Sequence, residues 1–321
     1  MALRACIWNV HDMEPEALQW LGWSYASPIY NHLKSTDTLT FHAWSLFRKA
    51  YPEEIDQHTI FRVQERGLES IQYPSLIDRL SKLDVGMLTF LCIMTPRLSI
   101  SHLVALTKIQ GLAVLVLEDG SVGYRLEKER PLVDTIRSWG RSIAESSVLS
   151  KLRVFVLSGY HGIESSVVLK SVSSLLSLNL VGINGPYTPP EIKDCGGDWQ
   201  DDRLQRLTFD GTTPAAIWES AATTRASTMQ QLYDFSLGIS RTNPTKESAY
   251  QSVSMTYSQS QAPVAVSSTY WFYRELRDGP DPRIKRSQSI SQSEQTDNHG
   301  KKRKIRNEKK VGVDALLGSF M

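Results

Sequence analysis

A pattern of large apolar residues, L-x-x-L-x-L or a close version of it, recurs along the middle of the chain. It occurs five times, with copies beginning at Leu88, Leu112, Leu152, Leu175 and Leu204. The steps between copies are 24, 40, 23 and 29 residues, and three of these four steps match the roughly 20 to 29 residues of one leucine-rich repeat. One strand and one helix cannot bury their apolar faces alone, so the pattern predicts stacked strand-helix units that share a core.

We therefore expect an α/β fold, an irregular leucine-rich-repeat-like solenoid of about five strand-helix units, with a helical N-terminal region and a disordered C-terminal tail. The tail is expected to be disordered because, from Arg277 onward, Phe320 is its only aromatic residue. The expected organisation is a helix-rich cap over 1–80, the repeat region over 81–212, a helix, loose insertion and aromatic capping segment over 213–276, and a disordered basic tail over 277–321.

Large aromatic residues punctuate the expected cap. Trp20, Trp23, Trp44 and Phe47 lie in stretches with helical spacing of apolar residues. Because large rings dominate core burial, we expect all four to lie in the core. Near the other end, residues 238–268 are rich in Ser, Thr, Gln and Pro, which predicts a loose insertion, and 270–273 (Tyr-Trp-Phe-Tyr) are expected to be an internal cover or a terminal cap.

Side chains alternate along a strand, so each repeat strand has two faces. Leu115 and Leu117 are expected to point toward the helices. The opposite, concave face would carry Phe90, Cys92, Met94, Val114, Val116, Val154 and Val156. Two explanations account for an apolar concave face: the chain covers it with its own segments, or it is a groove that binds a partner. The second explanation makes these seven residues the candidate partner-binding site.

The net charge of +2 hides an asymmetry between body and tail. Residues 277–321 contain 11 Lys and Arg and 6 Asp and Glu, which leaves 25 and 28 in residues 1–276. The body is thus mildly acidic, which argues against nucleic-acid binding by the folded part, and any such contact is expected only weakly through the tail. Within the tail, a run of basic residues predicts recognition by a nuclear-import receptor, with Lys301, Lys302, Arg303, Lys304 and Arg306 as the signal.

Two further features of the tail suggest regulated binding. The last eleven residues place Leu316, Leu317 and Phe320 on one apolar face if they are helical, which is typical of a helix that docks into a groove. The alternative is that this end folds back onto the body. Upstream, Ser287 and Ser289 closely follow Arg and Lys residues, so a basophilic kinase could phosphorylate them. The alternative there is a soluble linker without modification.

Catalytic and metal-binding patterns are missing from the sequence. It contains no GxSxG, P-loop, HExxH or GxGxxG motif, and the three cysteines fit no CxxC spacing, so we expect neither an enzyme, nor a cofactor, nor a metal site. No apolar run is long enough to span a membrane, and no secretory signal is evident. The expected location is nuclear, with the cytoplasm as the alternative.

The repeats resemble the leucine-rich-repeat superfamily. Residues 28–35 (PIYNHLKS) and 45–52 (SLFRKAYP) look like a group of uncharacterised fungal proteins that contain such repeats, and the likeness covers about residues 25–210. The group supplies no activity to transfer. The sequence departs from the pattern where such repeats place Asn or Cys three residues after the last leucine of the strand motif, because the residues there are Pro96, Gly120, Tyr160, Ile183 and Thr212.

These observations predict a nuclear scaffold that binds an unidentified protein partner through its repeat surface, its tail or both. The alternative is a substrate-recognition adaptor of a ubiquitin ligase, because repeats of this kind often follow an F-box, although residues 1–80 carry no clear F-box pattern.

Overall fold

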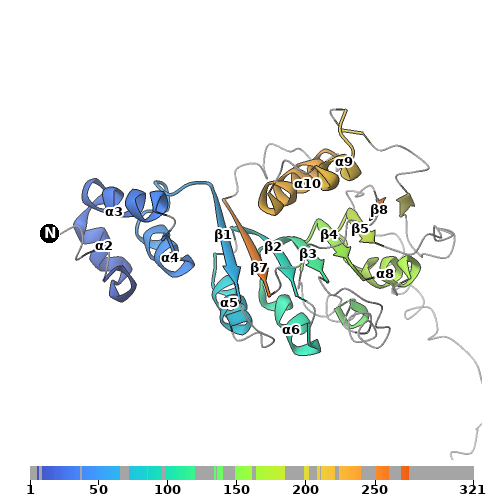
Figure 1. Ribbon diagram of the computed structural model, residues 1–321, viewed down its shortest axis with the longest axis horizontal. Coiled ribbons are helices and arrows are strands. Elements are labelled where there is room, and N and C mark those ends of the chain that lie inside the picture. The colour runs from blue at the N-terminus through green and yellow to red at the C-terminus, as the bar shows by residue number, and fades with distance from the viewer. Residues whose placement is uncertain are drawn as a thin grey trace, which may run out of the picture. The chain divides into compact units, whose positions relative to one another are not determined.

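A computed structural model describes the fold of most of the body (Figure 1). The residues that it describes are 6, 9–36, 38–65, 72–84, 86–95, 98–119, 134, 136–139, 149–160, 164–184, 199–201, 208–209, 211–220, 224–239, 251–259 and 269–274. All of them belong to one compact unit, Met1–Leu276.

An all-helical start is followed by a mixture of helices and strands. In chain order they are η1 (Val10–Asp12), α2 (Pro15–Leu21), α3 (Trp23–Ser35), α4 (Phe41–Ala50), β1 (His58–Gln64), α5 (Gln72–Ser81), β2 (Leu88–Met94), α6 (Ile100–Ala105), η2 (Leu106–Lys108), β3 (Leu112–Glu118), β4 (Val154–Ser158), α8 (Ser165–Val172), β5 (Leu180–Asn184), β6 (Gln200–Asp201), α9 (Pro214–Glu219), α10 (Arg225–Ile239), β7 (Ser252–Ser258) and β8 (Thr269–Tyr273).

The strands form one eight-stranded sheet in the order β1-β7-β2-β3-β4-β5-β8-β6. The first six are parallel to one another, whereas β8 runs antiparallel to β5 and β6 antiparallel to β8. The expected α/β class is confirmed. Strands β2, β3, β4 and β5 are neighbours in chain order, as a stack of repeats requires, but the sheet as a whole is not a solenoid.

Helices cover the two faces of the sheet (Figure 1). Side chains of α5, α6 and α8 join one apolar core, and side chains of α9 and α10 join a second core on the opposite face. The predicted alternation is correct in β3, where Leu115 and Leu117 lie in the first core and Val114 and Val116 in the second. Strands buried on both faces explain why these segments read as continuous apolar runs.

Strand β7 is the largest departure from the expected organisation. It lies between β1 and β2, inside the stretch 238–268 that composition predicted to be a loose insertion. Its Val253, Met255 and Tyr257 fill the first core, while the small Ser254 is fully buried on the face toward α10. A small side chain such as that of Ser254 leaves room for α10 to lie close to the sheet. This is how a Ser-rich segment can form a central strand.

The last two copies of the repeat pattern also differ from expectation. The fourth begins at Leu175, but β5 starts only at Leu180, whose side chain lies in the second core instead of the first. In the fifth copy, Leu204 and Leu207 lie outside the described residues. Phe209 forms an isolated bridge with Thr212 and is partly exposed, so the described part of this copy adds no strand to the sheet.

The N-terminal region is helical as predicted, although β1 and α5 within 1–80 belong to the sheet layers. Helix α3 continues through Pro28. Phe61 of β1 packs edge-on against Phe41 (ring centroids 5.4 Å apart) and against Trp44 (5.5 Å), so α4 and the sheet share one core. Residues 270–273 lie in β8, where they extend the sheet beside β5.

Candidate functional site

The seven residues predicted to line a concave groove lie beneath helices of the same chain. Six of them are fully buried in the core under α9 and α10, and Met94 is partly buried at its margin. Phe90, for example, packs against Tyr233 of α10 with ring centroids 5.1 Å apart. Of the two explanations given for this apolar face, the structure agrees with the first, because α9 and α10 of the same chain cover it, and the expectation of a partner-binding groove is corrected. The repeats themselves gave no sign of this cover because it comes from a distant part of the chain.

The predicted tail sites lie outside the described residues. They are the nuclear-import signal Lys301, Lys302, Arg303, Lys304 and Arg306, the C-terminal motif Leu316, Leu317 and Phe320, and the phosphorylation sites Ser287 and Ser289. These assignments stay predictions.

The carboxyl ends of the parallel strands are the usual place for a ligand in an open α/β sheet, and here they carry a buried ion pair. Glu118 at the end of β3 is fully buried, and its Oε1 lies 2.8 Å from Arg225 Nε at the start of α10. The guanidinium of Arg225 lies over the ring of Trp218, 4.1 Å from its centroid. Burial raises the pKa of the Glu118 carboxyl, and the nearby Arg225 opposes that rise.

Neighbouring strand ends are tied together by further side-chain bonds. Tyr257 in β7 donates to Glu65, which follows β1. Thr95, which follows β2, donates to Gln259, which follows β7. Burial raises the pKa of the Cys92 thiol well above its ordinary value, so this thiol stays protonated and unreactive. The two hydrogen bonds, from Tyr257 to Glu65 and from Thr95 to Gln259, thus join adjacent strands at this edge of the sheet.

A different feature, on the N-terminal helices, has the character of a binding surface. Trp20 at the end of α2 is 92% exposed, Tyr25 in the first turn of α3 is 70% exposed, and Leu21 between them is 37% exposed. We refer to Trp20, Leu21 and Tyr25 as the N-terminal aromatic surface. The expectation that Trp20 lies in the core is wrong, because α2 buries only Leu18 and turns Trp20 outward.

Local packing holds this surface in place. Gly22 forms the corner between α2 and α3 with φ 78°, a left-handed conformation that glycine adopts without strain. Just after the corner, the ring of Trp23 packs against Tyr51 at 5.1 Å and Tyr30 at 6.2 Å between centroids. Tyr51 also donates its hydroxyl to the carbonyl of Leu18. These contacts hold the corner in place, while the side chains of Trp20, Leu21 and Tyr25 are exposed to solvent.

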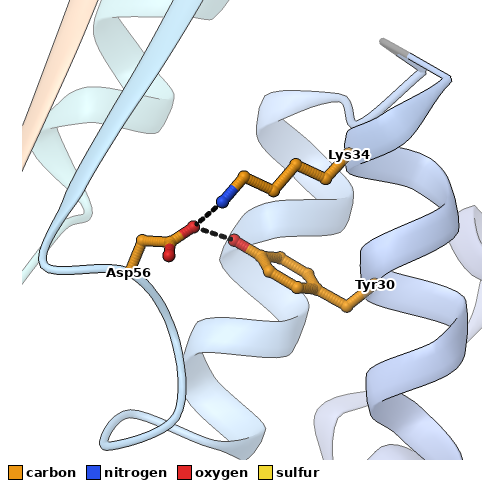
Figure 2. Close-up of polar contacts among 3 residues, drawn as sticks. All are labelled: Tyr30, Lys34 and Asp56. Carbon is orange, nitrogen blue, oxygen red and sulfur yellow. Dashed lines mark hydrogen bonds and ion pairs between the residues drawn. The ribbon is translucent and has the colours of Figure 1, made fainter.

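A polar cluster connects α3 to the segment that precedes β1 (Figure 2). Asp56 Oδ2 accepts from Lys34 Nζ at 2.6 Å and from the Tyr30 hydroxyl at 3.5 Å. Burial, together with the Asp56 charge, raises the pKa of Tyr30 to about 12, so this phenol remains a donor at neutral pH. The cluster orients α3 and satisfies the positive charge of Lys34.

Comparisons of the chain with protein-family models, with curated proteins and with solved structures find no match. Within the described residues, no group of three or more His, Cys, Asp or Glu side chains is arranged to hold a metal ion. Over the same residues, no helix has both the length and the apolar character to cross a membrane.

Sequence reasoning missed the N-terminal aromatic surface because large rings in helical segments were all expected to lie in the core. One signal was present: Trp20 lies two residues after Leu18, so a helix that buries Leu18 cannot also bury Trp20 on the same narrow face.

Proposed function

We propose that this protein is a protein-binding scaffold whose N-terminal aromatic surface docks a partner. The single observation that carries the proposal is the exposure of Trp20 next to Tyr25 and Leu21. Trp and Tyr are enriched at interfaces and dominate hot spots, since each ring brings a large contact area with little loss of side-chain freedom. A nearly complete exposure of a tryptophan indicates a side chain that is available to another molecule.

In this proposal, the sheet is a rigid support for the N-terminal aromatic surface. The sequential units β2 to β5, with helices on one face, are consistent with a repeat-like origin of this layer, and its cores give the N-terminal helices a fixed base. We keep the solenoid-like interpretation for these four units only. In this proposal the tail carries the nuclear-import signal, which consists of Lys301, Lys302, Arg303, Lys304 and Arg306.

The test is affinity purification with mass spectrometry on three full-length chains: the natural one, a Trp20→Ala/Tyr25→Ala double variant and a Leu176→Ala control. Leu176 is also 70% exposed but lies after α8, away from the N-terminal helices. We expect the double variant to lose partners that the control retains. With a purified partner, a hot-spot loss of about 2 kcal/mol or more corresponds to a Kd raised roughly 30-fold.

A chain ending at Leu276 separates the body from the tail in the same experiment. Partners retained by the shortened chain and lost by the double variant support docking on the N-terminal surface. Partners lost only on shortening would assign recognition to the tail and contradict the proposal.

The alternative function, a substrate adaptor of a ubiquitin ligase, draws on one observation: the exposed aromatic residues lie in a helical segment that precedes the sheet. Copurification of ligase components with the natural chain, lost in the double variant, would favour that alternative. Purification without any ligase component would remove it.

A further inference from the structure

The acidic and basic residues in the segment that carries the N-terminal aromatic surface are unevenly distributed. Residues 9–31 contain three carboxylates, Asp12, Glu14 and Glu16, and neither Lys nor Arg. All three side chains are exposed, and among the described residues none of them forms an ion pair. The next Lys or Arg along α3, Lys34, already pairs with Asp56 (Figure 2). These three carboxylates therefore have no ion-pair partner within the part of the chain that the structure describes.

Helical spacing places one of these carboxylates beside the exposed indole. Glu16 and Trp20 are four residues apart in α2, and residues at this spacing are neighbours on a helix surface. A cation that lies over an indole face is attracted by the negative face of the ring, most often as the guanidinium of an arginine. Glu16 and Trp20 together present both groups that hold a guanidinium, an acceptor and a ring face.

The same protein contains this combination with the guanidinium in place. Glu118, Arg225 and Trp218 form a carboxylate, a guanidinium and an indole in contact, at 2.8 Å for the ion pair and 4.1 Å to the ring centroid. In that cluster the arginine belongs to the chain itself. At Glu16 and Trp20 the carboxylate and the indole face solvent, and no arginine from the described residues reaches them.

We infer that the N-terminal aromatic surface recognises an arginine-containing segment of a partner protein, whose guanidinium lies between Glu16 and Trp20 while an adjacent aliphatic side chain contacts Leu21 and Tyr25. This inference rests on the proposed function and adds the chemistry of the partner. Glu14 and Asp12 add attraction at longer range, so binding weakens as salt screens the charges.

The test uses the full chain labelled with 5-fluorotryptophan and followed by fluorine NMR. The chain has eight tryptophans, and a Trp20→Phe variant identifies the Trp20 signal. The probe is a twelve-residue peptide with Arg and Leu at helical spacing, and its matched control carries citrulline, the neutral isostere of arginine, at every Arg position. We expect the arginine peptide to shift the Trp20 signal with a Kd at least about tenfold lower than that of the citrulline peptide.

Two variants locate the charge. Glu16→Gln should weaken binding of the arginine peptide several-fold, whereas Glu164→Gln, which changes an exposed carboxylate just before α8, should leave it unchanged. Thermal unfolding of both variants checks that the fold is intact. Equal binding of the arginine and citrulline peptides, equal effects of the two variants, or no shift of the Trp20 signal with either peptide would overturn the inference.

Failure of this inference is distinguishable from failure of the proposed function. Loss of partners from the Trp20→Ala/Tyr25→Ala variant, together with peptides that bind regardless of charge, would support the docking surface. The same result would contradict the recognition of arginine. Partners retained by that variant would discard the docking surface itself.

Discussion

At the scale of single residues, Glu118 shows how one buried charge is accommodated. It has no exposed surface, and its carboxylate would be costly in an apolar layer without compensation. Arg225 supplies the compensation from the start of α10, and Trp218 holds the guanidinium flat against its ring. Because burial is the larger influence, the pKa of Glu118 still lies above its ordinary value of 4.5.

The raised pKa makes stability depend on pH in a defined direction. The folded protein holds the Glu118 proton to a higher pH than the unfolded chain does, so the contribution of this group is complete below about pH 4.5 and declines as pH rises through the folded pKa. Glu118→Gln stays neutral and keeps an acceptor for Arg225. We therefore expect the free energy of unfolding of the variant, relative to the natural protein, to increase with pH above 4.5.

Urea unfolding measured at intervals between pH 4 and pH 8 checks this expectation. Glu53→Gln, at an exposed position, serves as the control and should show no such trend. A difference between Glu118→Gln and the natural chain that is constant over this range would contradict the assignment of a raised pKa.

At the scale of elements, the side chain of Arg274, which follows β8, forms hydrogen bonds with the turn that precedes β5. Arg274 is buried and donates from Nε to the carbonyl of Leu178 at 2.6 Å and from a terminal nitrogen to that of Ser173 at 2.8 Å. A third bond reaches the carbonyl of Leu175, and the guanidinium lies 4.6 Å from the ring centroid of Trp199. One residue thus satisfies the carbonyls that follow α8 and connects β8 to β5.

Removal of this guanidinium should be costly. Arg274→Met keeps much of the side-chain volume but leaves three carbonyls without their charged donor, and each such bond contributes about 1.5–3 kcal/mol. We expect a loss of roughly 3 kcal/mol or more in the free energy of unfolding, measured by chemical denaturation. Arg62→Met, at an exposed position of β1, should change stability by less than about 0.5 kcal/mol. Equal changes in the free energy of unfolding of the two variants would show that the hydrogen bonds of Arg274 do not stabilise the fold.

At the scale of the whole molecule, the sheet depends on segments from both ends of the body. Strand β7 separates β1 from β2, and α10 covers the face formed by Phe90, Val114 and Val154. A solenoid is held together by contacts between neighbouring repeats, so it tolerates loss of a distant segment. This sheet does not have that independence, because its second core is completed only when α9, α10 and β8 are in place.

Truncation distinguishes these two architectures. A chain ending at Thr212 lacks α9, α10, β7 and β8, and it would expose the apolar face of β2, β3 and β4 to water. We expect it to bind a hydrophobic dye and to unfold without a cooperative transition, whereas a chain ending at Leu276 should unfold cooperatively. Cooperative unfolding of the shorter chain would favour a self-sufficient repeat layer.

The amino-acid sequence by itself determined the features that depend on local periodicity. The strands β2, β3 and β4, and the alternation that sends Leu115 to one face and Val114 to the other, follow from residue spacing of two. Helices in the N-terminal region and after Thr213 also follow from local spacing and capping. These features require only neighbours in the chain, so no long-range contact had to be known.

Tertiary structure decided the features that depend on which distant segments meet. A strand with two apolar faces has the same sequence whether its cover is a partner or a helix such as α10, and the Ser-rich β7 is a strand only because it fits between β1 and β2. The N-terminal aromatic surface is also a feature that depends on distant segments. Whether Trp20 is buried or exposed depends on what packs over α2, and such packing is set by the whole fold and not by the residues beside it.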